Sequence, residues 1–289
     1  MTLGESELIL NPDGSIYHLN LLPSEIANTI ITVGDPDRVK SVSKYFDSIE
    51  VKKERREFHT HTGFYKNKRL TVISTGIGTD NIDIVFNELD ALANIDFKTR
   101  KVKQDKTQLD FIRIGTSGAV RKDISVDSFV LSTSAIGLEG LLHFYDSEPA
   151  RNLGLERELS SNLKWAEFDI HPYAVDCDNT LAERILSNRI RSGITVTNSG
   201  FYGPQGRTLR IPARLRDFTN ELSGFSFENR SITNLEMETA GIYGLAKLLG
   251  HRAISLNAIL ANRITGEFSA NGFKTVDALI KYTLEKIIE

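Results

Sequence analysis

The arrangement of apolar residues constrains the fold of this chain more than any other feature of its sequence. Short runs rich in valine, isoleucine and threonine recur along the chain, and most of them end at a glycine or another turn residue. Such runs are typical of buried β-strands. The predicted strands cover residues 29–33, 70–74, 111–114, 128–132, 194–197 and 253–260.

Segments with a helical period lie between these strands. In the clearest of them, 275–288, the apolar side chains from Val276 to Ile288 fall on one face of a helix. The other predicted helices cover 82–93, 181–191 and 240–249. Alternating strands and helices predict an α/β fold with a central mixed sheet flanked by helices. Because no linker rich in proline, glycine or serine divides the sequence, we expect a single domain over residues 1–289.

The composition argues against two classes of partner. The net charge of −3 at pH 7 is not the basic surplus that nucleic-acid-binding proteins usually carry. No stretch approaches the roughly 20 apolar residues of a membrane span. The only cysteine, Cys177, cannot form an intrachain disulfide, and the N-terminal residues lack the basic start of a signal peptide. We therefore expect a cytoplasmic protein that binds neither nucleic acid nor membranes.

Candidate ligand-binding groups occur at the ends of two predicted strands, where α/β proteins usually bind ligands. The segment from Gly34 to Arg38 suits an anion site at the start of a helix, although the same residues also form ordinary turns. Arg113 lies in an otherwise apolar strand, so its guanidinium needs either a bound anion or a structural carboxylate partner. The residues that follow it, 115–118, offer backbone and hydroxyl donors suited to phosphate.

A loop of different character follows the strand at 194–197. It contains Phe201, Gln205 and Arg207. An aromatic ring can stack on a flat heterocycle, a carboxamide offers both a donor and an acceptor, and a guanidinium can stabilise negative charge on a carbonyl oxygen. We interpret this loop as a pocket for a heterocyclic base, with a plain surface loop as the alternative.

The segment Glu236-Met237-Glu238 contains the only internal methionine of the chain, between two acids. If the segment is extended, both carboxylates face the same side and can bind adjacent hydroxyl groups, such as those of a ribose. If it begins the helix predicted at 240–249, the acids instead favour the positive end of that helix. The residues alone leave both interpretations open.

Three further features have a structural interpretation beside a functional one. His59 and His61 could face the same side of a strand and act as metal ligands. Because no third ligand is near, a solvent-facing strand is the expected explanation. The basic run 98–106 is expected to be a solvated loop rather than a site for an anionic partner. Residues 75–79 lack the glycine spacing of a dinucleotide-binding loop, and Cys177 is expected to be an unreactive thiol.

Five motifs in order resemble the nucleoside phosphorylase-I family, and their pattern is most similar to that of the uridine phosphorylases. They are Gly34-Asp35-Pro36-Asp37-Arg38, Arg56-Glu57-Phe58, Arg113-Ile114-Gly115-Thr116, the loop from Phe201 to Arg207, and Glu236-Met237-Glu238. The similarity runs from about residue 17 to the C-terminus. It implies a phosphorylase fold and the reversible phosphorolysis of uridine to uracil and ribose 1-phosphate, with phosphate as a co-substrate and no cofactor or metal.

The resemblance also implies a role for each matching residue. The implied phosphate-binding residues are Gly34, Arg38, Arg113, Thr116 and, from a neighbouring subunit, Arg56. The implied ribose-binding residues are Glu236, Met237, Glu238 and, from the neighbour, His18. The implied base-binding residues are Phe201, Gln205, Arg207 and Arg263. The implied catalytic residues are Arg38, Arg113, Gln205, Arg207 and Glu238. Since two chains would share each site, we expect a homodimer as the smallest active unit, with a hexamer of such dimers as the larger alternative.

The alternatives within the family are a purine nucleoside phosphorylase and a related nucleosidase, and a catalytically silent nucleoside-binding protein is the alternative outside enzymes. Purine enzymes place an aspartate where this chain has Asn262, and an amide cannot act as an acid. Three arginines at phosphate-binding positions argue against a nucleosidase. Residues 78–81 depart from the bacterial pattern, which puts an intersubunit monovalent-cation site in doubt.

Overall fold

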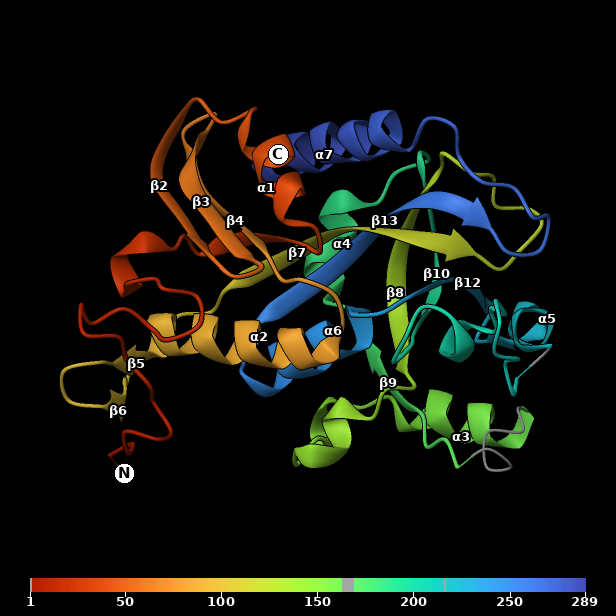
Figure 1. Cartoon of the computed structure of the whole chain (residues 1–289), viewed down its shortest axis with the longest axis horizontal. Helices are drawn as coiled ribbons and strands as arrows, with labels where there is room; N and C mark the ends of the chain where they lie inside the picture. The colour runs from red at the N-terminus through yellow and green to blue at the C-terminus, as the bar shows by residue number, and fades with distance from the viewer. Residues whose placement is uncertain (1, 163–168, 216) are drawn as a thin grey trace.

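The computed structural model describes residues 2–162, 169–215 and 217–289. In this part of the chain a large mixed sheet forms the centre of the fold (Figure 1). Its strands are β1 (Thr29–Val33), β2 (Ser48–Arg55), β3 (Phe58–Tyr65), β4 (Lys68–Ser74), β7 (Asp110–Ala119), β8 (Phe129–Gly137), β9 (Tyr173–Asp176), β10 (Ile190–Thr197), β11 (Ser226–Phe227), β12 (Arg230–Glu236) and β13 (Arg252–Asn262). The strand order is β11-β12-β10-β8-β13-β7-β1-β4-β3-β2, and β9 pairs with β8.

Strand β12 pairs on two sides and so closes part of this sheet on itself. It lies parallel to β10, with Glu236 opposite Thr197, and antiparallel to β7, with Leu235 opposite Gly118. The pairings that run from β12 through β10, β8, β13 and β7 therefore return to β12. This closure brings residues near the C-terminal ends of β7, β10 and β12 close together, although they are far apart in the sequence.

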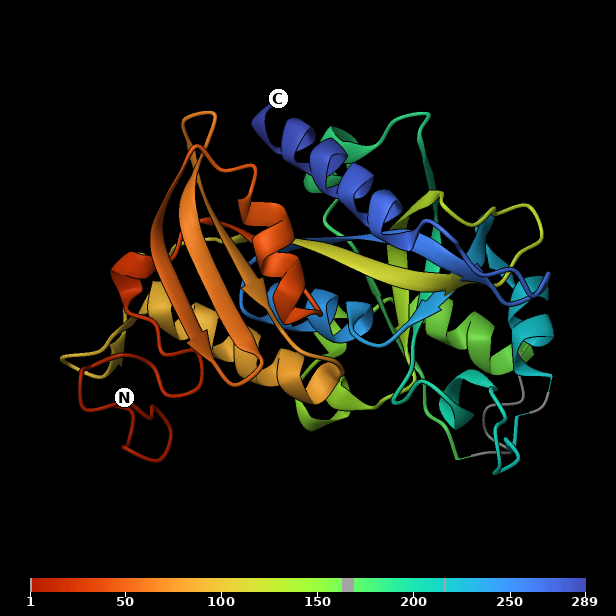
Figure 2. The same ribbon diagram turned by 45° about the horizontal axis from the view of Figure 1, so that its top comes forward.

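Helices cover both sides of the sheet. α1 (Pro36–Ser43) and α4 (Asn179–Ile185) each pack against α7 (Gly272–Ile288), and α2 (Thr79–Asn94) packs against α6 (Thr239–Leu248). Figures 1 and 2 show α7 on one side of the strands and α2 on the other. α3 (Leu153–Asn162) packs against β9, and α5 (Phe218–Gly224) packs against β12. The predicted apolar face of α7 is buried, with Leu279, Ile280 and Leu284 in the core.

The predicted α/β fold with a central mixed sheet and flanking helices is confirmed, and most predicted elements agree with the structure. β1 has the predicted bounds, and the other five predicted strands correspond to the longer strands β4, β7, β8, β10 and β13. The helices predicted at 82–93, 240–249 and 275–288 correspond to α2, α6 and α7.

Two predicted segments are wrong in part. Residues 115–118, which were predicted to follow the strand, instead continue β7, because β13 pairs with all four of them and β12 pairs with Gly118. The helix predicted at 181–191 ends at Ile185, and β10 already begins at Ile190. Residues 190–191 pair with β8, a long-range contact that a local helical pattern does not reveal.

The expectation of a solvent-facing strand is wrong for His61 of β3. The imidazole is buried under α1, and its Nδ1 lies 2.7 Å from Ser43 Oγ. Among the described residues, no group of three histidine, cysteine or acidic side chains could hold a metal ion. The basic run 98–106 is largely exposed, and part of it forms a small hairpin of β5 (Ile95–Asp96) and β6 (Lys101–Val102).

Two further expectations concern the membrane and the thiol. Within the described ranges, none of the helices has the length and apolar character needed to span a membrane. Cys177 is buried after β9, and its burial, with added repulsion from Asp176 and Asp178, raises the pKa of the thiol to about 12. The thiol therefore stays protonated at neutral pH, as expected of an unreactive cysteine.

Candidate active site

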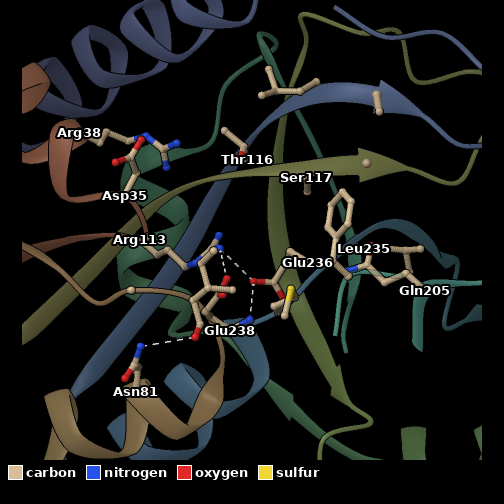
Figure 3. Close-up of a pocket in the computed structure, with 18 of the residues that line it drawn as sticks. Asp35, Arg38, Asn81, Arg113, Thr116, Ser117, Gln205, Leu235, Glu236 and Glu238 are labelled. Atoms are coloured by element: carbon tan, nitrogen blue, oxygen red, sulfur yellow. Dashed lines mark hydrogen bonds and ion pairs between the residues drawn. The ribbon is translucent and has the colours of Figure 1, made fainter. Parts of the chain in front are cut away.

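A cavity of about 730 Å³ lies beside the closed set of strands, a volume typical of small-molecule sites. Figure 3 shows Asp35 and Arg38 at one end of it, Gln205 at the other, and Glu236 and Glu238 between them. The predicted site residues that line the cavity are Gly34, Arg38, Arg113, Thr116, Phe201, Gln205, Arg207, Glu236, Met237 and Glu238.

One end of the cavity is the start of α1. Asp35 caps this helix, because its Oδ1 accepts a 2.9 Å hydrogen bond from the amide two residues further on. Arg38 lies in the first turn, and its Nη1 donates to the Ile114 carbonyl of β7 over 3.4 Å. Burial lowers the pKa of Arg38; Asp35 opposes this effect, and Arg113 adds to it. An anion bound here would compensate the positive charge of Arg38.

The centre of the cavity is organised around Arg113, which has structural carboxylate partners. Its Nη2 lies 2.5 Å from Glu238 Oε2 and 3.2 Å from Glu236 Oε2. Its Nη1 donates to Asn257 Oδ1 over 3.0 Å. Gly115 leaves the space for this arrangement, because a Cβ atom at that position would lie only 1.8 Å from the Arg113 Nη1. The guanidinium is therefore folded back over its own strand and held on both sides.

The two acids beside Arg113 are bound differently. Glu236 ends β12, and its carboxylate accepts hydrogen bonds from Thr197 Oγ1 over 2.6 Å and from the amides of Glu238 and Thr239, over 3.0 Å and 2.9 Å, at the start of α6. The helix-end interpretation is thus confirmed for Glu236. Glu238 points to the cavity, where one oxygen faces the guanidinium and Oε1 accepts a 2.8 Å hydrogen bond from the Gly78 amide.

This centre buries one positive and two negative charges. Burial alone lowers the pKa of Arg113, but the carboxylates of Glu236 and Glu238 outweigh that effect and raise it. Burial raises the pKa of Glu238; Arg113 opposes this shift, and Glu236 adds to it. The Arg113 guanidinium therefore stays charged, and the negative charge of Glu238 is only partly compensated. Hydroxyl groups of a ligand that donate to Glu238 would stabilise its charged form.

The other end of the cavity is the loop between β10 and α5. Gln205 is buried at the end of a short 3-10 turn, η5 (Gly203–Gln205). Arg207 Nη1 donates to Gln205 Oε1 over 2.5 Å and to the Phe201 carbonyl over 2.7 Å. The guanidinium carbon of Arg207 lies 3.7 Å from the centre of the Phe201 ring. The structure thus brings together the three side chains that the sequence suggested for a base pocket.

The charge of Arg207 is held by neutral oxygens. Burial lowers the pKa of its guanidinium to about 10, and the nearby Arg263 adds to this effect. In the described ranges, no acidic side chain forms an ion pair with Arg207. A guanidinium that is fixed by neutral oxygens and still charged at neutral pH suits a ligand that carries or develops negative charge.

The chain is similar to a known protein family over most of its length. The sequence model of the phosphorylase superfamily matches residues 28–289. The chain belongs to this superfamily. A uridine phosphorylase of Thermococcus kodakarensis is 30% identical over 283 residues, which cover 96% of this chain and 87% of that protein. A DeoD-type purine nucleoside phosphorylase of Buchnera aphidicola is 26% identical over 283 residues, which cover 95% of this chain and all (100%) of that protein.

A solved structure shows the same similarity in three dimensions. It is that of a Trypanosoma brucei nucleoside phosphorylase, described as showing uridine phosphorylase activity. The two chains are 28% identical and align with a TM-score of 0.87, over 97% of this chain and 99% of the other.

Three residues predicted from the resemblance lie outside the cavity of this phosphorylase chain. Arg263 lies behind the base loop, where its Nη1 donates to the Gln205 carbonyl over 3.1 Å. His18 lies beside α2, and Arg56 lies in the turn between β2 and β3 with a positive φ of 54°. These last two are the residues expected to act in a neighbouring subunit, and their roles stay predictions.

Asn262, which occupies the place of the acid of purine enzymes, is also outside the lining of the cavity. Its Nδ2 donates to the carbonyls of Arg121 and Ile124, both over 2.8 Å. Its Oδ1 accepts from the amides of Ile264 and Thr265 over 2.9 and 3.0 Å. Both donors and both lone pairs of the amide are therefore used, the donors by the segment after β7 and the lone pairs by the turn after β13.

Sequence reasoning missed several residues that shape the cavity. The Gly78 amide holds Glu238, Asn257 holds Arg113, and Asn81 lines the cavity beside Gly76. The sequence contains a signal for the first of these, because two glycines so close together often mark a special turn. In the structure, Gly76 and Gly78 have positive φ values of 71° and 96°. The partner of Gly78, Glu238 just before α6, is distant in sequence, so no local pattern identifies it.

Proposed function

We propose that this chain is a uridine phosphorylase, which converts uridine and phosphate to uracil and ribose 1-phosphate in a reversible reaction. The observation that carries this proposal is a single cavity in which a helix-start arginine, a carboxylate–arginine centre and the loop of Phe201, Gln205 and Arg207 follow one another. These parts suit a phosphate, a sugar diol and a heterocycle with carbonyl oxygens. The activities named for the Thermococcus and Trypanosoma relatives support the choice.

Phosphate is proposed to bind at the start of α1, with Gly34, Arg38, Thr116 and Arg113 around it. Gly34 lies close to the neighbouring loop, since a Cβ atom there would be 3.4 Å from the Gly76 carbonyl. A phosphate oxygen attacks C1′ of the nucleoside as the bond from C1′ to the base nitrogen breaks, and the electron pair of that bond leaves with uracil. Fixed arginines contribute by holding the nucleophile against C1′.

The sugar is proposed to lie over the central acids. Glu238 is the acceptor for the ribose hydroxyls, and Met237 packs against the ring. Glu236 acts mainly by positioning, because its oxygens already hold Thr197 and the start of α6. The negative charge of this centre also suits the positive, oxocarbenium-like sugar of the transition state.

The base is proposed to lie against Phe201 and to be read by Gln205 and Arg207. As uracil departs it takes negative charge, and preorganised donors stabilise that charge more in the transition state than in the substrate. Arg263 supports this loop through the Gln205 carbonyl.

We further propose that the working unit is at least a homodimer, in which His18 and Arg56 of one chain complete the site of the other. Mixing inactive Arg56→Ala chains with inactive Arg207→Ala chains tests this arrangement. In a mixed dimer one site has both native residues, so activity returns on mixing. No recovery after confirmed subunit exchange would show that each chain uses its own Arg56. A hexamer of dimers is the proposed larger form, and the cytoplasm, which keeps the single thiol reduced, is the proposed compartment.

The deciding experiment measures uracil release from uridine in buffers with and without phosphate. The proposal predicts release that depends on phosphate and yields one ribose 1-phosphate for each uracil. Equal rates without phosphate would identify a nucleosidase instead. Tight uridine binding without any turnover would identify a silent binding protein.

A purine nucleoside phosphorylase is the second candidate, because the DeoD-type relative matches nearly the whole chain. The bonding of Asn262 argues against it, since this amide offers no acid and faces backbone groups rather than the cavity. Inosine assayed in parallel with uridine separates the two candidates. Faster turnover of inosine would overturn the choice of uridine.

A further inference from the structure

Glu88 in the middle of α2 makes an unusual set of contacts to the N-terminal part of the chain. Its carboxylate accepts hydrogen bonds from the His18 amide, over 3.1 Å to either oxygen, and from the Leu19 amide over 2.9 Å. The same carboxylate lies 2.6 Å from His18 Nδ1. One side chain thus holds both the backbone and the ring of His18, from 70 positions away.

The surroundings of His18 fix the ring further. Leu19 and Leu21 are buried on the C-terminal side of the histidine, and they anchor the segment to the core. The Tyr17 ring meets the imidazole edge-on, with ring centres 4.8 Å apart, and the Arg55 guanidinium lies over that same tyrosine ring. The His18 side chain nevertheless keeps 26% of its surface exposed, so the ring is immobilised at the surface of the chain and not enclosed in it.

A carboxylate can only accept hydrogen bonds, so the proton on the imidazole must reside on Nδ1. In the neutral ring the lone pair is then on Nε2. Within the part of the chain that the structure describes, Nε2 has no hydrogen-bond partner. The result is a fixed acceptor that points away from its own carboxylate and is available to a hydroxyl group outside the chain.

We propose that Glu88 is a positioning residue for catalysis: it fixes the ring and tautomer of His18 so that Nε2 accepts a hydrogen bond from the ribose 5′-hydroxyl in the neighbouring subunit. This inference rests on the proposed function, in which His18 of one chain completes the ribose site of its neighbour. A purely structural role, in which Glu88 only ties down residues 17–19, would affect all substrates alike.

The test compares uridine with 5′-deoxyuridine, which lacks the hydroxyl in question, by measuring kcat/KM for both with saturating phosphate. We expect the native protein to prefer uridine by about tenfold or more, the value of one well-placed hydrogen bond. Glu88→Ala is expected to reduce that preference to the level of His18→Ala, mainly by lowering kcat/KM for uridine. The double variant His18→Ala/Glu88→Ala is expected to lose nothing further.

Two more variants keep the test decisive. Glu88→Gln retains one acceptor oxygen and part of the backbone contacts, so it is expected to fold and to retain an intermediate preference. Asp83→Asn removes a carboxylate five residues earlier on α2, where it contacts Tyr145 and Asn87, and is expected to leave the preference unchanged.

The outcomes separate the possible failures. The role of Glu88 is overturned if native protein releases uracil but Glu88→Gln keeps the full preference for uridine. It is also overturned if Glu88→Gln lowers kcat/KM equally for uridine and 5′-deoxyuridine. If His18→Ala keeps the preference, the contact to the 5′-hydroxyl is overturned as well. If native protein converts neither nucleoside in the presence of phosphate, the proposed function itself fails.

Discussion

The two halves of the cavity are held together in contrasting ways. The centre around Arg113, Glu236 and Glu238 is buried, and its hydrogen bonds join elements that are far apart in the sequence. The base loop is bonded largely within itself, through Arg207, Gln205 and Phe201, and Phe201 remains 51% exposed. The contrast implies that the contacts of the centre stabilise the fold, whereas the contacts of the base loop contribute little to it. Substitutions should therefore affect stability and activity together in the first region and separately in the second.

The strongest test of the comparison is Arg113→Ala. It would leave two buried carboxylates without their counter-charge, so we expect the free energy of unfolding to fall by about 3–5 kcal/mol. We also expect uridine phosphorolysis to fall by more than roughly 10³-fold, since both the phosphate site and the sugar site lose a group. Denaturant unfolding and steady-state kinetics measure the two effects. A loss of activity with a stability change under about 1 kcal/mol would break the claim that this centre supports the fold.

The next test is Arg207→Ala in the base loop. The transition state loses a donor to the departing base, so kcat/KM for uridine should fall by about 10²–10³-fold. The free energy of unfolding should change by less than about 1 kcal/mol, because the contacts of Arg207 are local. Arg210→Ala, an exposed arginine in the same segment, is the matched control and should leave both quantities unchanged. A large destabilisation by Arg207→Ala would contradict the proposed independence of this loop.

Asn262→Asp sharpens the comparison at the border between the two regions. The carboxylate cannot donate to the carbonyls of Arg121 and Ile124, so we expect a loss of about 2 kcal/mol in stability. We expect no gain of inosine turnover, because the side chain faces backbone groups. Measurable inosine phosphorolysis in this variant would show that the position reaches the base after all.

The smallest effect is expected at an exposed ion pair, which serves as the counterpart of the buried one. Lys44 Nζ lies 2.6 Å from Asp277 Oδ1, and contacts with Lys44, Tyr45 and Lys281 outweigh partial burial and lower the pKa of Asp277 from 3.8 to about 2. A lowered pKa stabilises the fold at pH values above 3.8, and this contribution is lost as the pH falls towards 2.

Asp277→Asn should therefore cost less than about 1 kcal/mol at pH 7, because solvent screens this pair. The difference in the free energy of unfolding between variant and native protein should disappear as the pH falls from 3.8 towards 2. Urea unfolding at pH 7 and at low pH measures it. A cost comparable to that of Arg113→Ala would show that burial is not what distinguishes the two ion pairs.

The sequence predicted the elements of this fold better than their ends. The apolar run at 29–33 was sufficient to place β1, because a buried strand needs little more than its own pattern. The helix predicted at 181–191 ended too late, since pairing with β8 competes with the helical period from Ile190 onward. Residues 115–118 were predicted to follow a strand but belong to it, because β13 pairs with all four of them and β12 pairs with Gly118.

The candidate site was predictable in its residues but not in its connections. Strand ends and residue chemistry indicated Arg38, Arg113 and Gln205, and the structure places all three around one cavity. The sequence could not decide whether Arg113 is bound by a carboxylate, because that depends on the register between β7 and β12. Nor could it reveal that Asn262 is fully used by backbone groups, which requires the course of the turn after β13.

Gly115 carries a consequence for how this site can change over generations. The Arg113 guanidinium occupies the space that a side chain at position 115 would need. The order in which these two positions are substituted therefore matters. Any larger residue at 115 would push the guanidinium off its carboxylates while Arg113 is present, and the three atoms nearest to a Cβ at 115 all belong to the Arg113 side chain. A side chain larger than glycine at position 115 therefore fits only after Arg113 has been replaced by a smaller residue. The single methyl group of an alanine at this position is enough to displace the guanidinium while Arg113 is present.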